Sequence, residues 1–191
     1  MYKSVLDYFE ETVKRVPEKK AIRHNEDDCT FAMLQEQAQK LGSYMIELVG
    51  DIKNRPIVVL LPKSMDAVVA DLGISYSCNI FNNLDVKTPV HRLENIIKLL
   101  KPVMVITNNA YKDMLSWQEY DVKLLNLDET VLCDININAE ELEKRRKELI
   151  DTDPFCIINT SGSTGTPKGV VLNYKSFFDF VTWADETFSF D

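Results

Sequence analysis

The residues best suited to chemistry in this sequence lie in one short stretch, NTSGSTGTPKGV, at positions 159–170. The stretch combines three glycines and five hydroxyl side chains with a single lysine, Lys168. Glycines leave backbone N–H groups accessible to phosphate oxygens, and the lysine adds positive charge. The stretch therefore predicts a phosphate-binding loop. A surface turn made of turn-forming residues is the alternative interpretation.

The surroundings of this loop exclude the common nucleotide-hydrolase motif G-x-x-x-x-G-K-[ST]. Pro167 stands five residues after Gly162, and Lys168 is followed by Gly169 instead of serine or threonine. That motif also opens a helix, whereas the apolar runs at 155–158 and 170–172 indicate a strand on each side. We therefore expect a strand, a loop that closes over a polyphosphate, and a second strand.

Strand and helix patterns alternate before the loop. Apolar runs predict strands at 21–23, 56–61, 80–81, 103–106 and 122–127. Apolar spacing and capping signals predict helices at 6–16, from a Thr30 cap to Gly50, at 64–76, from a Thr88 cap to Leu100, and at 139–149. The last of these, AEELEKRRKEL, is interpreted as a solvated surface helix with the i,i+4 ion pairs Glu140/Lys144, Glu141/Arg145 and Glu143/Lys147. The alternation predicts an α/β fold with a mostly parallel β-sheet flanked by helices.

Polar residues dominate at 134–153, and Asp153-Pro154 predicts a turn. We therefore expect an N-terminal α/β lobe at 1–152 and the start of the next lobe at 153–191, which contains the loop. After the loop, apolar and aromatic residues recur at helical spacing, namely Phe177, Phe180, Val181, Ala184 and Phe188. Much of what this helical face packs against is expected downstream, and an exposed face would favour self-association.

Composition narrows the expected partners. The 191 residues carry a net charge of −8, so nucleic acid and anionic membranes are not expected to bind. The N-terminus lacks a signal core, and no apolar run is long enough to span a bilayer.

The four cysteines stand singly and are interpreted as small buried residues in a reducing compartment. His24 and His91 are interpreted as surface residues. We expect a cytoplasmic protein.

Several stretches resemble the adenylate-forming superfamily, which includes acyl-CoA synthetases, peptide-synthetase adenylation domains, D-alanine carrier-protein ligases and luciferases. TSGSTGTPKG at 160–169 resembles the phosphate-loop motif of that family almost letter for letter. FEETVKRVPEKKAI at 9–22 is similar to its opening segment, and LGISYSCNIFNNLDVKTPVHRLENII at 72–97 to its second core motif. The resemblance implies that the chain is the N-terminal part of the large domain of such an enzyme.

This resemblance implies an ATP-dependent ligase that joins a small carboxylic acid to AMP and releases pyrophosphate. The acyl group then passes to a thiol, on a phosphopantetheinyl carrier protein or on CoA. By resemblance, the β- and γ-phosphates of ATP are cradled by Thr160, Ser161, Gly162, Ser163, Thr164 and Gly165. Lys168 would contribute positive charge, and Mg²⁺ would share the neutralisation.

The opening segment and SFFDFVTWADETFSFD at 176–191 look more like amino-acid-activating members, D-alanine carrier-protein ligases in particular. Asn83 and Asn173 depart from a proline and a histidine common in relatives. The family's catalytic residues lie downstream, so none is assigned here and the chain alone is expected to be inactive. A fatty acyl-CoA synthetase and a non-catalytic binding module are the alternatives.

Overall fold

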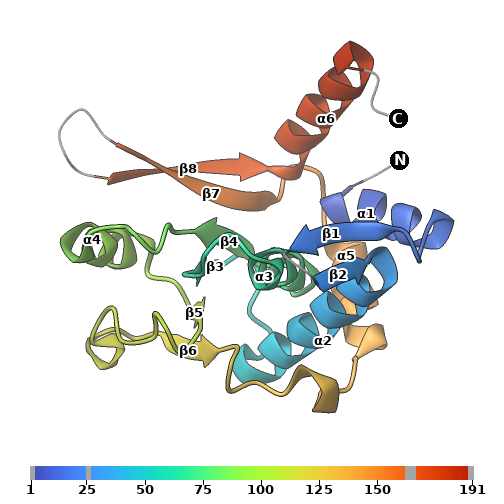
Figure 1. Ribbon diagram of the computed structural model, residues 1–191. Coiled ribbons are helices and arrows are strands. Elements are labelled where there is room, and N and C mark those ends of the chain that lie inside the picture. The colour runs from blue at the N-terminus through green and yellow to red at the C-terminus, as the bar shows by residue number, and fades with distance from the viewer. Residues whose placement is uncertain (1–2, 25–26, 162–166, 189–191) are drawn as a thin grey trace.

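The computed structural model describes residues 3–24, 27–161 and 167–188, which form a six-stranded sheet with helices on both faces (Figure 1). The strands follow the order β6-β5-β3-β4-β7-β8, and every neighbouring pair is parallel except β7 and β8. Their bounds are β3 Pro56–Val59, β4 Ile80–Asn83, β5 Met104–Thr107, β6 Lys123–Asn126, β7 Pro154–Ser161 and β8 Pro167–Asn173. The predicted fold class is confirmed.

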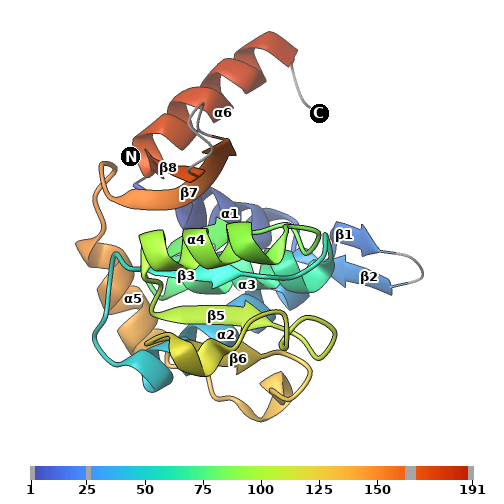
Figure 2. The ribbon, with the colours of Figure 1, turned by 90° about the vertical axis from the view of Figure 1, so that its left-hand side faces the viewer.

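Alternating side chains of the central strands bury both faces of the sheet. On one face, Ile57 and Met104 pack with α2 (Phe31–Val49) and α3 (Met65–Tyr76). On the other face, Val58 and Val105 pack against α4 (Val90–Leu100). Figure 2 shows α4 on the opposite side of the sheet from α2 and α3. The loops at the strand ends are therefore held by two separate apolar layers.

The remaining elements surround this core. They are α1 (Val5–Arg15), the antiparallel pair β1 (Lys20–His24) and β2 (Asp27–Thr30), two short 3₁₀ turns, η1 (Trp117–Glu119) and η2 (Leu132–Asp134), and the helices α5 (Ala139–Glu148) and α6 (Tyr174–Phe188). Helices α2 and α3 approach each other closely at two glycines, Gly42 on α2 and Gly73 on α3. A Cβ on Gly42 would lie 2.9 Å from the Cβ of Tyr76, so only glycine fits there without displacement.

The capping predictions divide. The Thr30 hydroxyl accepts a hydrogen bond from the Met33 N–H at 3.2 Å, which confirms it as the cap of α2. The prediction of Thr88 as the cap of α4 was wrong, because Pro89 occupies the cap position and no side chain caps the helix there. Cys133 is exposed, although Cys29, Cys78 and Cys156 are buried as predicted. His91 is exposed as predicted, and the side chain of His24 lies outside the described residues.

The interpretation of α5 as a solvated surface helix was wrong at Arg145, which is only 1% exposed. Its guanidinium donates to three main-chain carbonyl oxygens, those of Gly50 and Ile52 at 3.0 Å and of Ser77 at 3.2 Å. Gly50 and Ser77 are the C-terminal caps of α2 and α3. Because the last carbonyls of a helix lack donors within the helix, Arg145 supplies donors where two helices end.

The charge of Arg145 is offset by two carboxylates, those of Glu141 at 2.8 Å and Asp51 at 3.2 Å. The predicted i,i+4 pair of Glu141 with Arg145 is thus confirmed. Lys144 pairs with Glu141 at 3.2 Å instead of with Glu140. Helix α5 therefore combines an exposed, charged side with one buried arginine.

Strand β7 joins the parallel sheet beside β4, with Cys156 opposite Phe81. The lobe boundary expected near residue 152 stays a prediction.

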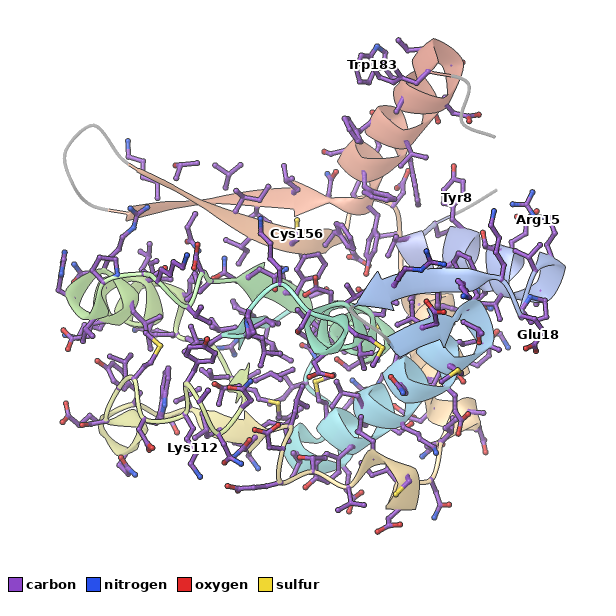
Figure 3. The ribbon with its side chains drawn as sticks, in the orientation of Figure 1. Tyr8, Arg15, Glu18, Lys112, Cys156 and Trp183 are labelled. Carbon is purple, nitrogen blue, oxygen red and sulfur yellow. The ribbon has the colours of Figure 1, made fainter. Side chains whose placement is uncertain are left out.

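Beyond β8, α6 stands away from the body of the protein (Figure 1), and Phe180, Trp183 and Phe188 on it are 60%, 52% and 59% exposed. Figure 3 shows Trp183 toward the far end of this helix, well separated from Cys156 on β7. Among the described residues, no helix has both the length and the apolar character needed to cross a bilayer.

Candidate phosphate-binding site

The predicted phosphate loop connects two long antiparallel strands, as the sequence indicated. Strands β7 and β8 pair from Pro154 opposite Asn173 to Ser161 opposite Pro167. In Figure 1 this hairpin extends past the end of β4 and over α4. The two strands predicted on either side of the loop are therefore confirmed. Gly162, Ser163, Thr164 and Gly165 lie outside the described residues.

Thr160 and Lys168 face each other across this hairpin, immediately before and after the loop. The Thr160 hydroxyl donates to the main-chain carbonyl of Lys168 at 3.4 Å, and both residues are exposed. Within the described part of the chain, the Lys168 ammonium has no carboxylate within ion-pair distance. The pairing thus brings one free cation and one hydroxyl together where the loop leaves the sheet.

Two asparagines fix the base of the hairpin to the end of β4. Asn82 is fully buried, and its amide nitrogen donates to the Ile157 carbonyl at 2.7 Å. The Asn159 amide nitrogen in turn donates to Oδ1 of Asn82 at 3.0 Å. These two hydrogen bonds orient Asn159, which lies just before the loop. The sequence carried one signal for it, since Asn82 is a polar residue inside a buried strand.

Close packing explains why position 169 is a glycine. A Cβ there would lie 3.1 Å from Cγ2 of Ile157 and 3.7 Å from Cδ2 of Leu100 on α4. The first of these distances is tighter than ordinary van der Waals contact, so glycine lets β8 run close to its neighbours. The close approach keeps Lys168, the residue before it, at the sheet edge.

A cleft of about 650 Å³ opens beside the base of the hairpin, between β7, the end of β4 and the start of α4. Ligands of open α/β sheets bind at the carboxyl ends of parallel strands, and the cleft lies at that end of β4. Its polar lining consists of Asn83, Asp85, Lys87, Thr88, Arg92 and Asn159. Sequence reasoning named none of these as site residues, because their spacing follows no helix or strand period and only the fold brings them together.

A partly buried carboxylate, that of Asp71, contacts Asn83 in the lining of the cleft. Oδ2 of Asp71, on α3, accepts a hydrogen bond from the amide of Asn83 at 2.8 Å. Its Oδ1 is buried and has no hydrogen-bond partner among the described residues. Burial raises the pKa of Asp71 to about 6, and the Asn83 hydrogen bond opposes that rise. Asn83 therefore donates a hydrogen bond to a carboxylate that is costly to ionise.

Comparison with known proteins shows to which family the chain belongs. A family model described as AMP-binding enzyme matches residues 9–191. The chain belongs to the AMP-binding enzyme family. It is 31% identical over 97% of its length to a dimodular nonribosomal peptide synthase of Bacillus subtilis, of which it covers 8%. It is 28% identical over 99% of its length to a D-alanine–D-alanyl carrier protein ligase of Listeria welshimeri, of which it covers 36%.

Solved structures of low sequence identity show the same fold as this AMP-binding family chain. The nonribosomal peptide synthetase FmoA3 aligns with a TM-score of 0.81 at 19% identity, over 98% of this chain and 19% of the other. VinN in complex with 3-methylaspartate aligns with a TM-score of 0.81 at 20% identity, over 99% of this chain and 53% of VinN. The chain therefore spans only part of the length of the relatives that it matches.

Proposed function

We propose that this chain provides the phosphate-binding part of an ATP-dependent ligase. The ligase would join a carboxylic acid to AMP with release of pyrophosphate, then transfer the acyl group to a phosphopantetheine or CoA thiol. The observation that carries this proposal is the hairpin that places Lys168 opposite Thr160 at the ends of a glycine- and hydroxyl-rich loop, in a chain of the AMP-binding family. An ammonium without a carboxylate partner is suited to phosphate.

The chemistry explains why such a group is needed. A carboxylate is a weak nucleophile and ATP is also an anion, so the two reactants must be held in line and charge on the leaving pyrophosphate must be offset. In the proposal, Lys168 supplies part of that positive charge and the Thr160 hydroxyl adds a polar contact. Ser161, Gly162, Ser163, Thr164 and Gly165 remain proposed phosphate contacts by resemblance.

Magnesium is the second expected cofactor, and it usually binds through one or two carboxylates together with phosphate oxygens. Within the described ranges, no three His, Cys, Asp or Glu side chains gather as metal ligands. Asp85 is the one carboxylate in the lining of the cleft. The described residues therefore offer no complete cage, and we assign no magnesium ligand to this chain.

For the acid, we propose an amino acid, with D-alanine favoured over a fatty acid. The support is that the matched relatives include D-alanine–D-alanyl carrier protein ligases and nonribosomal peptide synthases. The hairpin itself does not distinguish among acids, because its exposed groups suit phosphate.

Replacing Lys168 with alanine is expected to weaken ATP binding by about tenfold, since one charge-assisted contact is lost. The exposed side chain contributes little to folding, so the free energy of unfolding should change by less than about 0.5 kcal/mol. Titration calorimetry and chemical denaturation measure the two quantities. Lys175→Ala removes the same charge beyond the opposite end of the hairpin and serves as the matched control. Equal ATP affinity in the two variants would contradict the role of Lys168.

The 191-residue chain alone is expected to show no acid-dependent exchange of pyrophosphate into ATP. The reason is that it spans 36% of the Listeria ligase, and by resemblance the adenine- and acid-binding residues belong to the part that it does not span. Exchange assays with D-alanine and with a fatty acid test this directly. Exchange above the level without acid would show that the chain carries a full active site.

A further inference from the structure

We propose that the cleft beside the hairpin binds the phosphate group of an organic phosphate ester, with Lys87 and Arg92 as its cationic ligands. This goes beyond the proposed function, which assigns phosphate binding to Lys168 and the loop. Lys87 lies in the turn after β4, and Arg92 lies in the first turn of α4. Both line the cleft of about 650 Å³.

The first support is the charge of the lining. Among the other arginines, Arg15 and Arg55 have no carboxylate within ion-pair distance in the described part of the chain, whereas Arg23, Arg145 and Arg146 each have one. Across the described ranges, neither Lys87 nor Arg92 has such a carboxylate partner. Each cation therefore retains charge that an anionic ligand would use.

Asp85 does not cancel these two charges. It is the single acidic residue among the lining residues, and one of its carboxylate oxygens accepts a hydrogen bond from the main-chain N–H of Lys87 at 2.8 Å. That bond fixes the turn that carries Lys87. With two cations against one carboxylate, the cleft has an excess of positive charge in a chain whose net charge is −8.

The second support is that the cleft has an apolar floor in addition to its charged and polar side chains. Leu84, Ile96 and Ile157 form an apolar floor and are 5%, 1% and 6% exposed. Thr88 and Asn159 add hydrogen-bonding side chains to the lining. Charges attract a phosphate more strongly beside such an apolar floor than in open water. The volume lies within the range of small-molecule sites and exceeds that of a bare phosphate ion, which favours a phosphate attached to an organic body.

Two compounds in the proposed reaction carry this chemistry: ATP and the phosphopantetheine-type thiol acceptor. Titration calorimetry on the 191-residue protein uses ATP, CoA and unphosphorylated pantetheine as probes. The test variant is K87Q/R92Q. The matched control is K98Q/K101Q, which removes two positive charges from the opposite end of α4. Thermal melts establish that both variants are folded.

K87Q/R92Q is expected to weaken binding of at least one phosphate-bearing probe by about tenfold or more, while K98Q/K101Q changes it less than about twofold. A loss confined to CoA identifies the phosphate as that of the thiol acceptor. A loss confined to ATP identifies the nucleotide, and a loss of both identifies a shared phosphate site. In each case pantetheine binding should be the same in wild type and variant.

Three results would overturn the proposal. They are equal losses in the test and control variants, a pantetheine loss as large as the CoA loss, and no detectable wild-type binding of either phosphate probe at millimolar concentration. The Lys168→Ala variant separates this proposal from the proposed function. If it leaves ATP affinity unchanged while K87Q/R92Q weakens CoA binding, the loop assignment fails and the cleft assignment stands.

Discussion

Replacing Arg145 with alanine is expected to lower the free energy of unfolding by about 3–5 kcal/mol. The substitution leaves the carbonyls of Gly50, Ile52 and Ser77 without the donor that they have in the native fold. It also leaves Glu141 without its 2.8 Å partner. For a chain of this size, each kcal/mol corresponds to a fall of about 2–4 °C in the melting temperature, which calorimetry or circular dichroism resolves easily.

Two variants on the same helix serve as controls. Arg146→Ala removes a partly exposed arginine whose ion pairs include Asp7 at 2.7 Å, so a loss of about 1 kcal/mol is expected. Arg145→Lys keeps the charge but lacks the planar fork that reaches several carbonyls at once, so it should recover only part of the loss. If Arg145→Ala cost no more than Arg146→Ala, the assigned role of Arg145 would be wrong.

The second large effect concerns pH. The pKa of Asp71 is raised to about 6 in the fold, against about 3.8 when exposed, so the native state binds this proton more tightly than the unfolded state between those values. Stability is therefore expected to fall as pH rises from about 4 to about 6 and to level off above. The shift corresponds to a loss of about 2–3 kcal/mol. Urea denaturation at several pH values from 4 to 7.5 measures it.

Asp71→Asn isolates this contribution. The amide cannot ionise, so the variant should lack most of the fall and should be more stable than the wild type at pH 7. Asp66→Asn, at an exposed position on the same helix, should keep the wild-type profile. An Asp71→Asn protein with the same pH dependence as the wild type would show that other groups govern this range.

The sequence allowed a correct prediction of the sheet and of the hairpin around the phosphate loop, because both depend on local signals. Buried parallel strands appear as continuous apolar runs. The antiparallel strands β7 and β8 also contain short apolar runs, which the glycine-rich stretch separates. Thr30 could be recognised as a cap because capping depends on a few neighbouring residues. These predictions needed no knowledge of contacts between distant residues.

Three features that the sequence did not predict, the buried Arg145, the cleft and the burial of Asp71, depend on contacts between distant segments. Arg145 sits within a run of charged residues typical of an exposed helix, and its partners lie near residues 50 and 77. The cleft likewise joins the turn after β4 to β7, and neither segment alone shows a binding pattern. Burial of Asp71 follows in the same way from the packing of α3 beside β4. The spacing of residues within one segment does not indicate which distant segments it will contact.

The order of strands in the sheet also has a consequence for synthesis on the ribosome. On one side Phe81 of β4 pairs with Ile57 of β3, which is translated earlier. On its other side the neighbour is Cys156 of β7, which is translated about 75 residues later. At typical elongation rates of about 5–20 residues per second, that edge stays open for roughly 4–15 s. During this interval the nascent chain presents an unpaired strand edge, a site where cellular chaperones are expected to engage it.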